Sequence, residues 1–175
     1  ARAVQLYEEL FENDVEDAEA ASALRDLYAA LGKRREPAKL LQTLIDTASG
    51  EETRSTLRIE LAKLQDAMGD SSAAIETLRS VLEENRGRTD AVVALSDLLE
   101  KGGKDEELAE LLAGQIEAAK ERSDAAAELA LQVRLGEVYE TRLKDAGKAL
   151  ATFEAVLERD ETHHGALEAV ARLAE

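Results

Sequence analysis

The fold is decided by residues 135–157, which read LGEVYETRLKDAGKALATFEAVL. In the first half, Leu135, Val138 and Tyr139 are three and four positions apart in a way that puts apolar side chains on one helix face. A second apolar set with helical spacing follows and includes Ala149 and Phe153. A polar break between the two sets offers an aspartate as a helix cap. The stretch therefore predicts two amphipathic helices packed back to back.

This hairpin pattern recurs along the chain. Copies of the first-helix type begin at Leu24, Leu61, Leu95, Leu135 and Val170, in steps of 37, 34, 40 and 35 residues. Copies of the second-helix type begin at residues 3, 37, 74, 108 and 149. Repeated periods of this size are typical of helical solenoids.

The repeated residues resemble the tetratricopeptide repeat. The likeness is carried by Leu135-Gly136, Tyr139, Ala149 and Phe153, followed by an acidic pair and a new helix, and it covers essentially the whole chain. The chain departs from the family pattern because it has no tryptophan and no proline that closes a repeat, and because three of the four steps are longer than 34 residues. The resemblance implies an all-α fold, a right-handed α-solenoid of antiparallel helix pairs with about ten helices.

We expect a single repeat domain over residues 1–175. Its expected parts are a lone second helix at 1–17, four repeats at 18–54, 55–88, 89–128 and 129–163, and a lone first helix at 164–175. Ala1 and Glu175 are both expected inside helices. The pattern is that of a segment from a longer array.

Helix boundaries are predicted from capping and stop residues. The side chains expected to start helices are Asp17, Ser49 with Glu52, Thr89, Ser123, Asp145 and Thr162. Single glycines, Gly32 and Gly69, are expected to end helices, as is the pair Gly102-Gly103. The helices that begin near Asp105 and Ser123 are expected to be longer than the others, which accounts for the 40-residue step.

Composition excludes several classes of function. The net charge of −16 argues against direct binding of a nucleic-acid backbone or an anionic membrane, since both require clustered Lys and Arg. The absence of cysteine removes disulfides and thiolate chemistry. Because the sequence shows neither a signal peptide nor an apolar membrane run, we expect no membrane insertion and a cytoplasmic location.

No motif in the sequence predicts catalysis or a cofactor. His163 and His164 are the two histidines, and adjacent helical residues point about 100° apart, so they are a poor metal site without further ligands. No glycine is followed by a phosphate-binding Gly-Lys-Ser sequence. We therefore expect no enzyme, no cofactor and no metal.

The resemblance implies that the first helix of each repeat lines an inner groove. The residue two positions after the first apolar residue of each copy faces this groove, which gives a ladder of Asp26, Lys63, Asp97, Glu137 and Arg172. The sign of the charge alternates along the ladder except between its third and fourth members. Further along the same two helices stand two more glutamates, with flanking cations. The predicted partner-binding residues are Asp97, Glu100, Lys101, Arg134, Glu137 and Glu140.

Three interpretations of this acidic cluster are open. It is a solvated face of an acidic protein, a seat for Lys or Arg of a bound partner, or a site for a hard cation such as calcium, for which helical carboxylates alone make a poor cage. The predicted function is a scaffold that binds a basic peptide or helix of a partner protein. The alternative is a structural spacer or self-assembly element that associates through its terminal helices.

Overall fold

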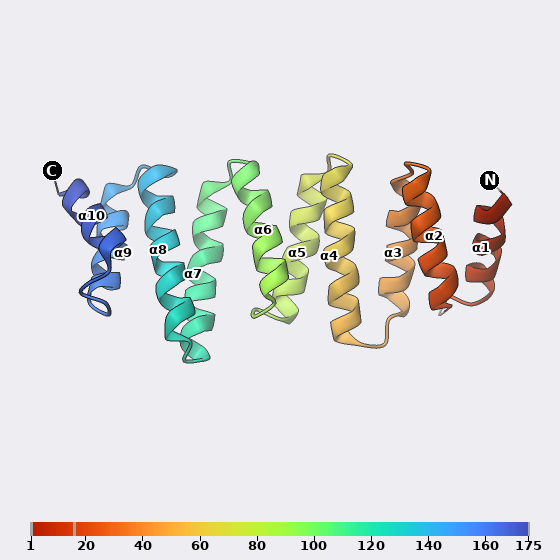
Figure 1. The fold of residues 1–175 in the computed structure, drawn as a ribbon, viewed down its shortest axis with the longest axis horizontal. Coiled ribbons are helices and arrows are strands. Elements are labelled where there is room, and N and C mark those ends of the chain that lie inside the picture. Colours follow the sequence, from red (N-terminus) through yellow and green to blue (C-terminus); the bar gives the residue numbers. More distant parts are fainter. Residues whose placement is uncertain (1, 16, 175) are drawn as a thin grey trace. The chain divides into compact units, whose positions relative to one another are not determined.

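The computed structural model describes residues 2–15 and 17–174, and this part of the chain contains ten α-helices and no β-strand (Figure 1). The predictions for Ala1 and Glu175 lie outside the described residues. The all-α fold predicted from the repeats is confirmed. The chain divides into two compact units, Ala1–Asn85 and Arg86–Glu175. The proposed division into individual repeats stays a prediction.

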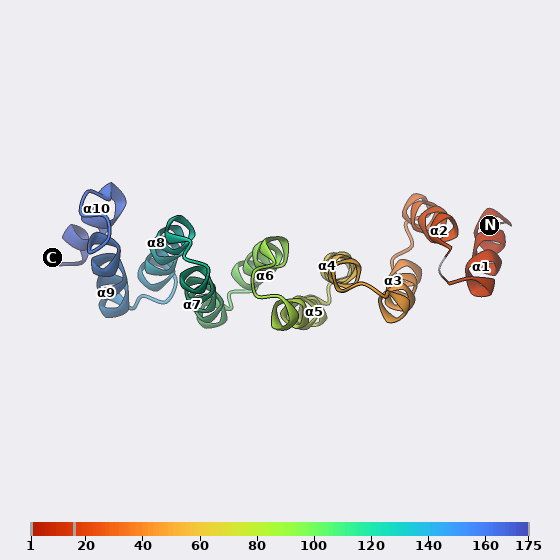
Figure 2. The same ribbon diagram turned by 90° about the horizontal axis from the view of Figure 1, so that it is seen from below.

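Each unit is a run of helical hairpins, in which helices pack on their neighbours along the chain. The first unit contains α1 (Arg2–Asn13), α2 (Ala18–Ala30), α3 (Arg35–Thr47), α4 (Glu51–Ala67) and α5 (Ser71–Glu84). The second unit contains α6 (Thr89–Lys101), α7 (Asp105–Glu121), α8 (Ala125–Thr141), α9 (Ala146–Leu157) and α10 (His164–Leu173). In each unit the even-numbered first-type helices lie on one side and the odd-numbered second-type helices on the other (Figure 2).

Several predicted boundaries are confirmed. The side chains of Asp17 and Asp145 cap α2 and α9 by accepting hydrogen bonds from backbone N–H groups. Gly32, Gly69 and Gly103 follow α2, α4 and α6 with φ of 64°, 87° and 65°, a conformation that glycine adopts without a steric penalty. As expected, α7 and α8 are long, with 17 residues each.

Four predicted starts are wrong. Helix α4 begins after Gly50, and no side chain caps it, so the box of Ser49 with Glu52 does not form. Helix α8 is capped by Asp124, because Ser123 takes a left-handed conformation with φ of 57°. Helix α10 is capped by the Nδ1 atom of His163, which accepts from Ala166 N at 3.2 Å, and Thr162 hydrogen-bonds to Asp160 instead. At α8 and α10 the residue directly after the predicted one provides the cap.

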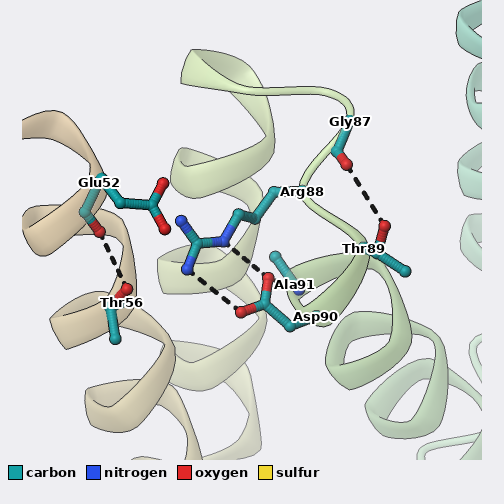
Figure 3. A network of polar contacts seen from close by, with 7 residues as sticks. All are labelled: Glu52, Thr56, Gly87, Arg88, Thr89, Asp90 and Ala91. Atoms are coloured by element: carbon teal, nitrogen blue, oxygen red, sulfur yellow. Dashed lines mark hydrogen bonds and ion pairs between the residues drawn. The ribbon is translucent and has the colours of Figure 1, made fainter.

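The start of α6 is the fourth of these corrections (Figure 3). Thr89 does not cap the helix, because its hydroxyl donates to Gly87 O at 3.5 Å. The guanidinium of Arg88 instead donates to both carboxylate oxygens of Asp90, at 2.7 and 3.2 Å. These hydrogen bonds lower the pKa of Asp90, which also accepts from Ala91 N. The negative charge is thereby held in the first turn of α6, where the helix dipole favours it.

The apolar spacing that predicted the helices also fills their cores. In the first unit, Leu24 and Tyr28 of α2 pack against Phe11 of α1. In the second unit, Phe153 of α9 is buried in a cluster that Tyr139 of α8 partly covers. Tyr28 is thus buried in the core of its unit, and Tyr139 packs against the core of the other.

Candidate functional site

The candidate site lies on the faces of the first-type helices. In the first unit, Asp26 projects from α2 and Lys63 from α4, and both are exposed. In the second unit, Asp97, Glu137 and Arg172 are exposed on α6, α8 and α10. Exposure of the five ladder residues agrees with the expected groove face.

Glu100, one turn beyond Asp97 on α6, is held by arginines of the same unit. Its Oε1 atom accepts from Arg134 Nη2 of α8 at 2.9 Å, and Arg142 Nη2 lies 3.8 Å from its Oε2 atom. Arg142 also donates to Asp105 of α7 at 3.0 Å. The predicted residues Glu100 and Arg134 are thus brought together, and each neutralises the other.

Glu140 of α8 forms the most complete ion pair on this face. Arg172 of α10 donates to it twice, from Nε at 2.6 Å and from Nη2 at 2.8 Å. These hydrogen bonds lower the pKa of Glu140 and raise the pKa of Arg172. The carboxylate of Glu140 therefore stays ionised and bound to Arg172 well below neutral pH.

Two carboxylates of the predicted set are left for a partner. Within the described residues, the side chains of Asp97 and Glu137 make no ion pair. Lys101, at the end of α6, is exposed. The face thus offers two exposed negative charges beside two neutralised pairs, an arrangement suited to cationic groups in water, where each contact contributes about 0.2–1 kcal/mol.

The corresponding face of the first unit has a different charge. A cleft of 610 Å³ between α2 and α4 is lined by four cationic and two acidic side chains, which are Arg25, Lys33, Arg34, Lys63, Asp26 and Glu60. Arg25 forms an ion pair with Glu60, and Arg34 donates to Ala67 O. Lys63 makes no ion pair within the described residues. A basic lining in a chain of net charge −16 distinguishes this cleft from the acidic face of the second unit.

The ion pairs between first-type helices were missed by the sequence reasoning. They join residues separated by about one repeat: Arg25 with Glu60, 35 apart; Glu100 with Arg134, 34 apart; and Glu140 with Arg172, 32 apart. Opposite charges one repeat apart on first-type helices are a signal that could have found them. The same search would also have matched Asp97 with Lys63, 34 residues apart, and Glu137 with Arg172, 35 residues apart, so only the structure separates the paired carboxylates from these two.

The histidines show no sign of a metal site. His163 caps α10, and His164 lies 3.1 Å from Glu168 on the exposed side of that helix. Among the described residues, no group of three or more His, Cys, Asp or Glu side chains is placed to hold a metal ion. In the same residues, no helix has the length and apolar character needed to cross a membrane.

Comparison with known proteins shows the fold. No protein-family model matches the sequence, and no match was found among curated proteins. Among solved structures, YrrB, described as a tetratricopeptide-repeat (TPR) protein with an unusual peptide-binding site, is 18% identical, with 96% of this chain and 81% of that chain covered and a TM-score of 0.54. MamA is 19% identical, with 90% and 86% covered and a TM-score of 0.55. The C-terminal part of a TPR repeat-containing protein from Cytophaga hutchinsonii is 17% identical, with 98% and 64% covered and a TM-score of 0.60. The chain has the tetratricopeptide-repeat fold.

Proposed function

We propose that this chain is a protein-protein interaction scaffold with no catalytic role, and that it binds a basic peptide or helix through the first-type helices of its second unit. The observation that carries the proposal is the contrast among four carboxylates on α6 and α8. Glu100 and Glu140 are held by arginines, whereas Asp97 and Glu137 are exposed and make no ion pair with any residue that the structure describes. The tetratricopeptide-like fold supports a binding role, since repeat arrays present extended surfaces for partners.

The chemistry of the partner follows from the charges. Exposed carboxylates attract Lys and Arg, and the net charge of −16 speeds the encounter with a basic partner while repelling acidic ones. The affinity of such contacts falls with salt, because the Debye length shrinks from about 10 Å at 0.1 M to about 3 Å at 1 M. YrrB, which has the same fold, is described as having a peptide-binding site, and this supports a peptide as the partner. A cytoplasmic location is part of the same proposal.

Charge reversal tests this proposal. Partners are first isolated with the intact chain and then measured with the double variant Asp97→Lys/Glu137→Lys, which we expect to lose binding while keeping its helicity and melting temperature. The matched control is Glu110→Lys/Glu121→Lys, which makes the same charge change at exposed positions of α7. If both variants bind the partner equally, the acidic face is only solvated surface, and the interaction lies elsewhere.

A second candidate function, self-association through the terminal helices, is favoured by exposed leucines. Leu6 and Leu10 of α1 are 53% and 50% exposed, and they line a shallow cleft of 460 Å³ together with Tyr7. Leu167 of α10 is 46% exposed. Large exposed apolar side chains on one helix face commonly mark contact sites.

Sedimentation at increasing protein concentration tests self-association. We expect dimers or larger species that the variant Leu6→Gln/Leu10→Gln removes. Leu31→Gln is the matched control, because Leu31 is equally exposed but lies at the end of α2. A strict monomer at high concentration contradicts this second function and leaves the peptide-binding proposal untouched.

A further inference from the structure

A second cleft of the first unit opens between two second-type helices. It has a volume of 490 Å³ and is lined by residues of α1, α2 and α3. Figure 2 shows α2 lying over the space between α1 and α3. Leu24 and Tyr28 contribute to the cleft from α2, and they point away from Asp26, because two helical positions turn a side chain by about 200°. The cleft is therefore separate from the face of the first-type helices.

The floor of this cleft is apolar. Phe11 of α1, Leu24 of α2 and Leu40 of α3 are buried members of one core cluster that also line the cleft. Val15 packs against the same cluster and lines the cleft as well. A volume of 490 Å³ lies in the range of about 300–1,000 Å³ that is usual for binding pockets. The cleft thus has both the space and the apolar surface to bury side chains of a partner.

The rim of the cleft is acidic. Glu8 and Glu12 of α1 and Glu36 of α3 face it, against a single cation, Lys39. Glu8 accepts a hydrogen bond of 2.6 Å from the Tyr28 hydroxyl, and burial followed by this hydrogen bond raises the pKa of Tyr28, so the phenol remains a donor. Glu8 is thereby fixed at the edge of the apolar floor.

The other two carboxylates of the rim, Glu36 and Glu12, differ in their partners. A hydrogen bond with its own backbone, followed by one from Lys33, lowers the pKa of Glu36. Glu12 is exposed and makes no ion pair within the described residues. The cleft is thus lined by three carboxylates and the ammonium group of Lys39, and Lys33 pairs with Glu36 beside it, so Glu12 is the carboxylate of the rim that makes no ion pair within the described residues.

We propose that the cleft between α1 and α3 binds a basic, partly apolar segment of a partner protein. The aliphatic stem of an arginine or lysine lies on Phe11 and Leu40, and its cationic group faces Glu8 and Glu12. Long basic side chains suit this place because they bury an apolar stem while their charge remains at the rim. A second copy of the chain does not suit it, since a surface of net charge −16 opposes an acidic rim.

The probe for this site is the capped peptide acetyl-Leu-Arg-Leu-Arg-Leu-amide, titrated into the isotope-labelled chain and followed by amide chemical shifts. We expect shifts at Phe11, Glu12, Tyr28 and Leu40. The same peptide with Gln in place of Arg is expected to bind about threefold to tenfold more weakly, because it keeps the apolar contacts and loses the ion pairs. Equal binding of the two peptides would overturn the proposal.

A matched pair of variants on α1 locates the binding. Glu12→Lys is expected to lower the affinity for the arginine peptide by about fivefold or more, because it reverses the charge of Glu12 at the rim. Glu9→Lys makes the same change on the same helix but lies on the face that carries Leu10, outside this cleft. If both variants lose the same affinity for the arginine peptide, binding depends only on the overall charge of the chain, and the proposal is wrong.

The double variant Asp97→Lys/Glu137→Lys separates this site from the scaffold face of the second unit. The proposal requires that it leave the peptide shifts on α1 and α3 in place. If those shifts disappear in that variant, the cleft is not an independent site. If they persist in that variant but the variant binds the partner of the second unit as well as its control does, the cleft stands without the proposed function.

Discussion

The hairpin of α8 with α9 and the hairpin of α2 with α3 hold the same place in the repeat pattern, but their helices meet differently. In the first, Gly136 of α8 lies so close to Phe153 of α9 that a Cβ atom at residue 136 would be 2.8 Å from the ring. In the second, the position equivalent to Gly136 is Arg25, whose side chain is 42% exposed and paired with Glu60 of α4. The position that is glycine in α8 therefore carries a long, partly exposed side chain in α2.

The buried residues of α3 divide between two cores. Leu40 packs with α1 and α2, whereas Leu41 and Ile45 form a separate cluster with residues of α4. The equivalent small position is buried Ala62 in α4 and buried Ser96 in α6. A small residue after the first leucine accompanies close packing of α4 on α5 and of α8 on α9. It is not sufficient for close packing, because α6 has Ser96 at this position and α7 still packs more on α8 than on α6.

The largest expected effect comes from Phe153→Ala. The ring of Phe153 is buried among residues of α8, α9 and α10. Truncation leaves a cavity that Gly136 cannot fill, because glycine has no side chain. We expect a loss of about 3–5 kcal/mol in the free energy of unfolding, measured by denaturant titration with circular dichroism. Phe153→Leu keeps most of the volume and is expected to cost about 1–2 kcal/mol. Similar values for the two variants would mean that the ring contact does not hold this hairpin.

The next largest effect is the change in stability when a helical glycine is replaced by alanine, and we expect opposite signs at Gly136 and Gly114. Gly136→Ala adds a methyl group against the Phe153 ring and is expected to cost about 1–3 kcal/mol, despite the better helix propensity of alanine. Gly114→Ala in α7 meets no atom within 4 Å and is expected to stabilise by about 0.5–1 kcal/mol. Thermal melts of both variants test this pair. Stabilisation by Gly136→Ala would show that the two helices are not in close contact.

The repeat spacing predicted the helices and their buried faces well, because apolar periodicity depends on the local chain and on burial alone. It also suggested Leu135-Gly136 as a family feature, although the reason, the ring of Phe153, is visible only in the packed hairpin. Caps were less predictable. At the start of α10, Thr162 and His163 stand side by side, and only the backbone conformation decides which of them caps the helix.

The exposure of the ladder residues was predictable, and the ion pairs beside them were not. Counting two residues on from the first apolar residue of each copy gave five exposed residues, since helix geometry fixes which face a residue occupies. Ion pairing depends on contacts between residues about one repeat apart. From the sequence alone, Glu100 and Glu140 could therefore not be distinguished from Asp97 and Glu137. The cleft between α1 and α3 was not expected at all, because it depends on how far the two helices stand apart.

A smaller effect on stability is expected at Arg25, the residue by which α2 differs from the other first-type helices. Arg25→Ala removes the ion pair with Glu60, whose side chain is also partly exposed, and keeps good helix propensity. We expect a change within about 1 kcal/mol in the free energy of unfolding, in contrast to the cost of altering the equivalent Gly136. A loss above about 2 kcal/mol would show that Arg25 is part of the core packing, and the comparison between the two hairpins would fail.

The smallest expected effect is the pH dependence of stability that comes from the ion pair of Glu140 in α8 with Arg172 in α10. The hydrogen bonds from Arg172 lower the pKa of Glu140 in the folded chain, so the pair stabilises the fold above the usual glutamate pKa of about 4.3 and loses this contribution as the pH falls through the lowered value. Glu140→Gln, which lacks the charge at every pH, is therefore expected to melt about 1–2 °C below the parent at pH 7. The two melting temperatures should converge below about pH 4, as the parent's carboxylate takes up its proton. Arg172→Ala is the control, and it should show the same convergence, since it removes the other half of the same pair. A difference between Glu140→Gln and the parent that stays constant down to pH 2 would mean that the side chain acts through packing and not through its charge.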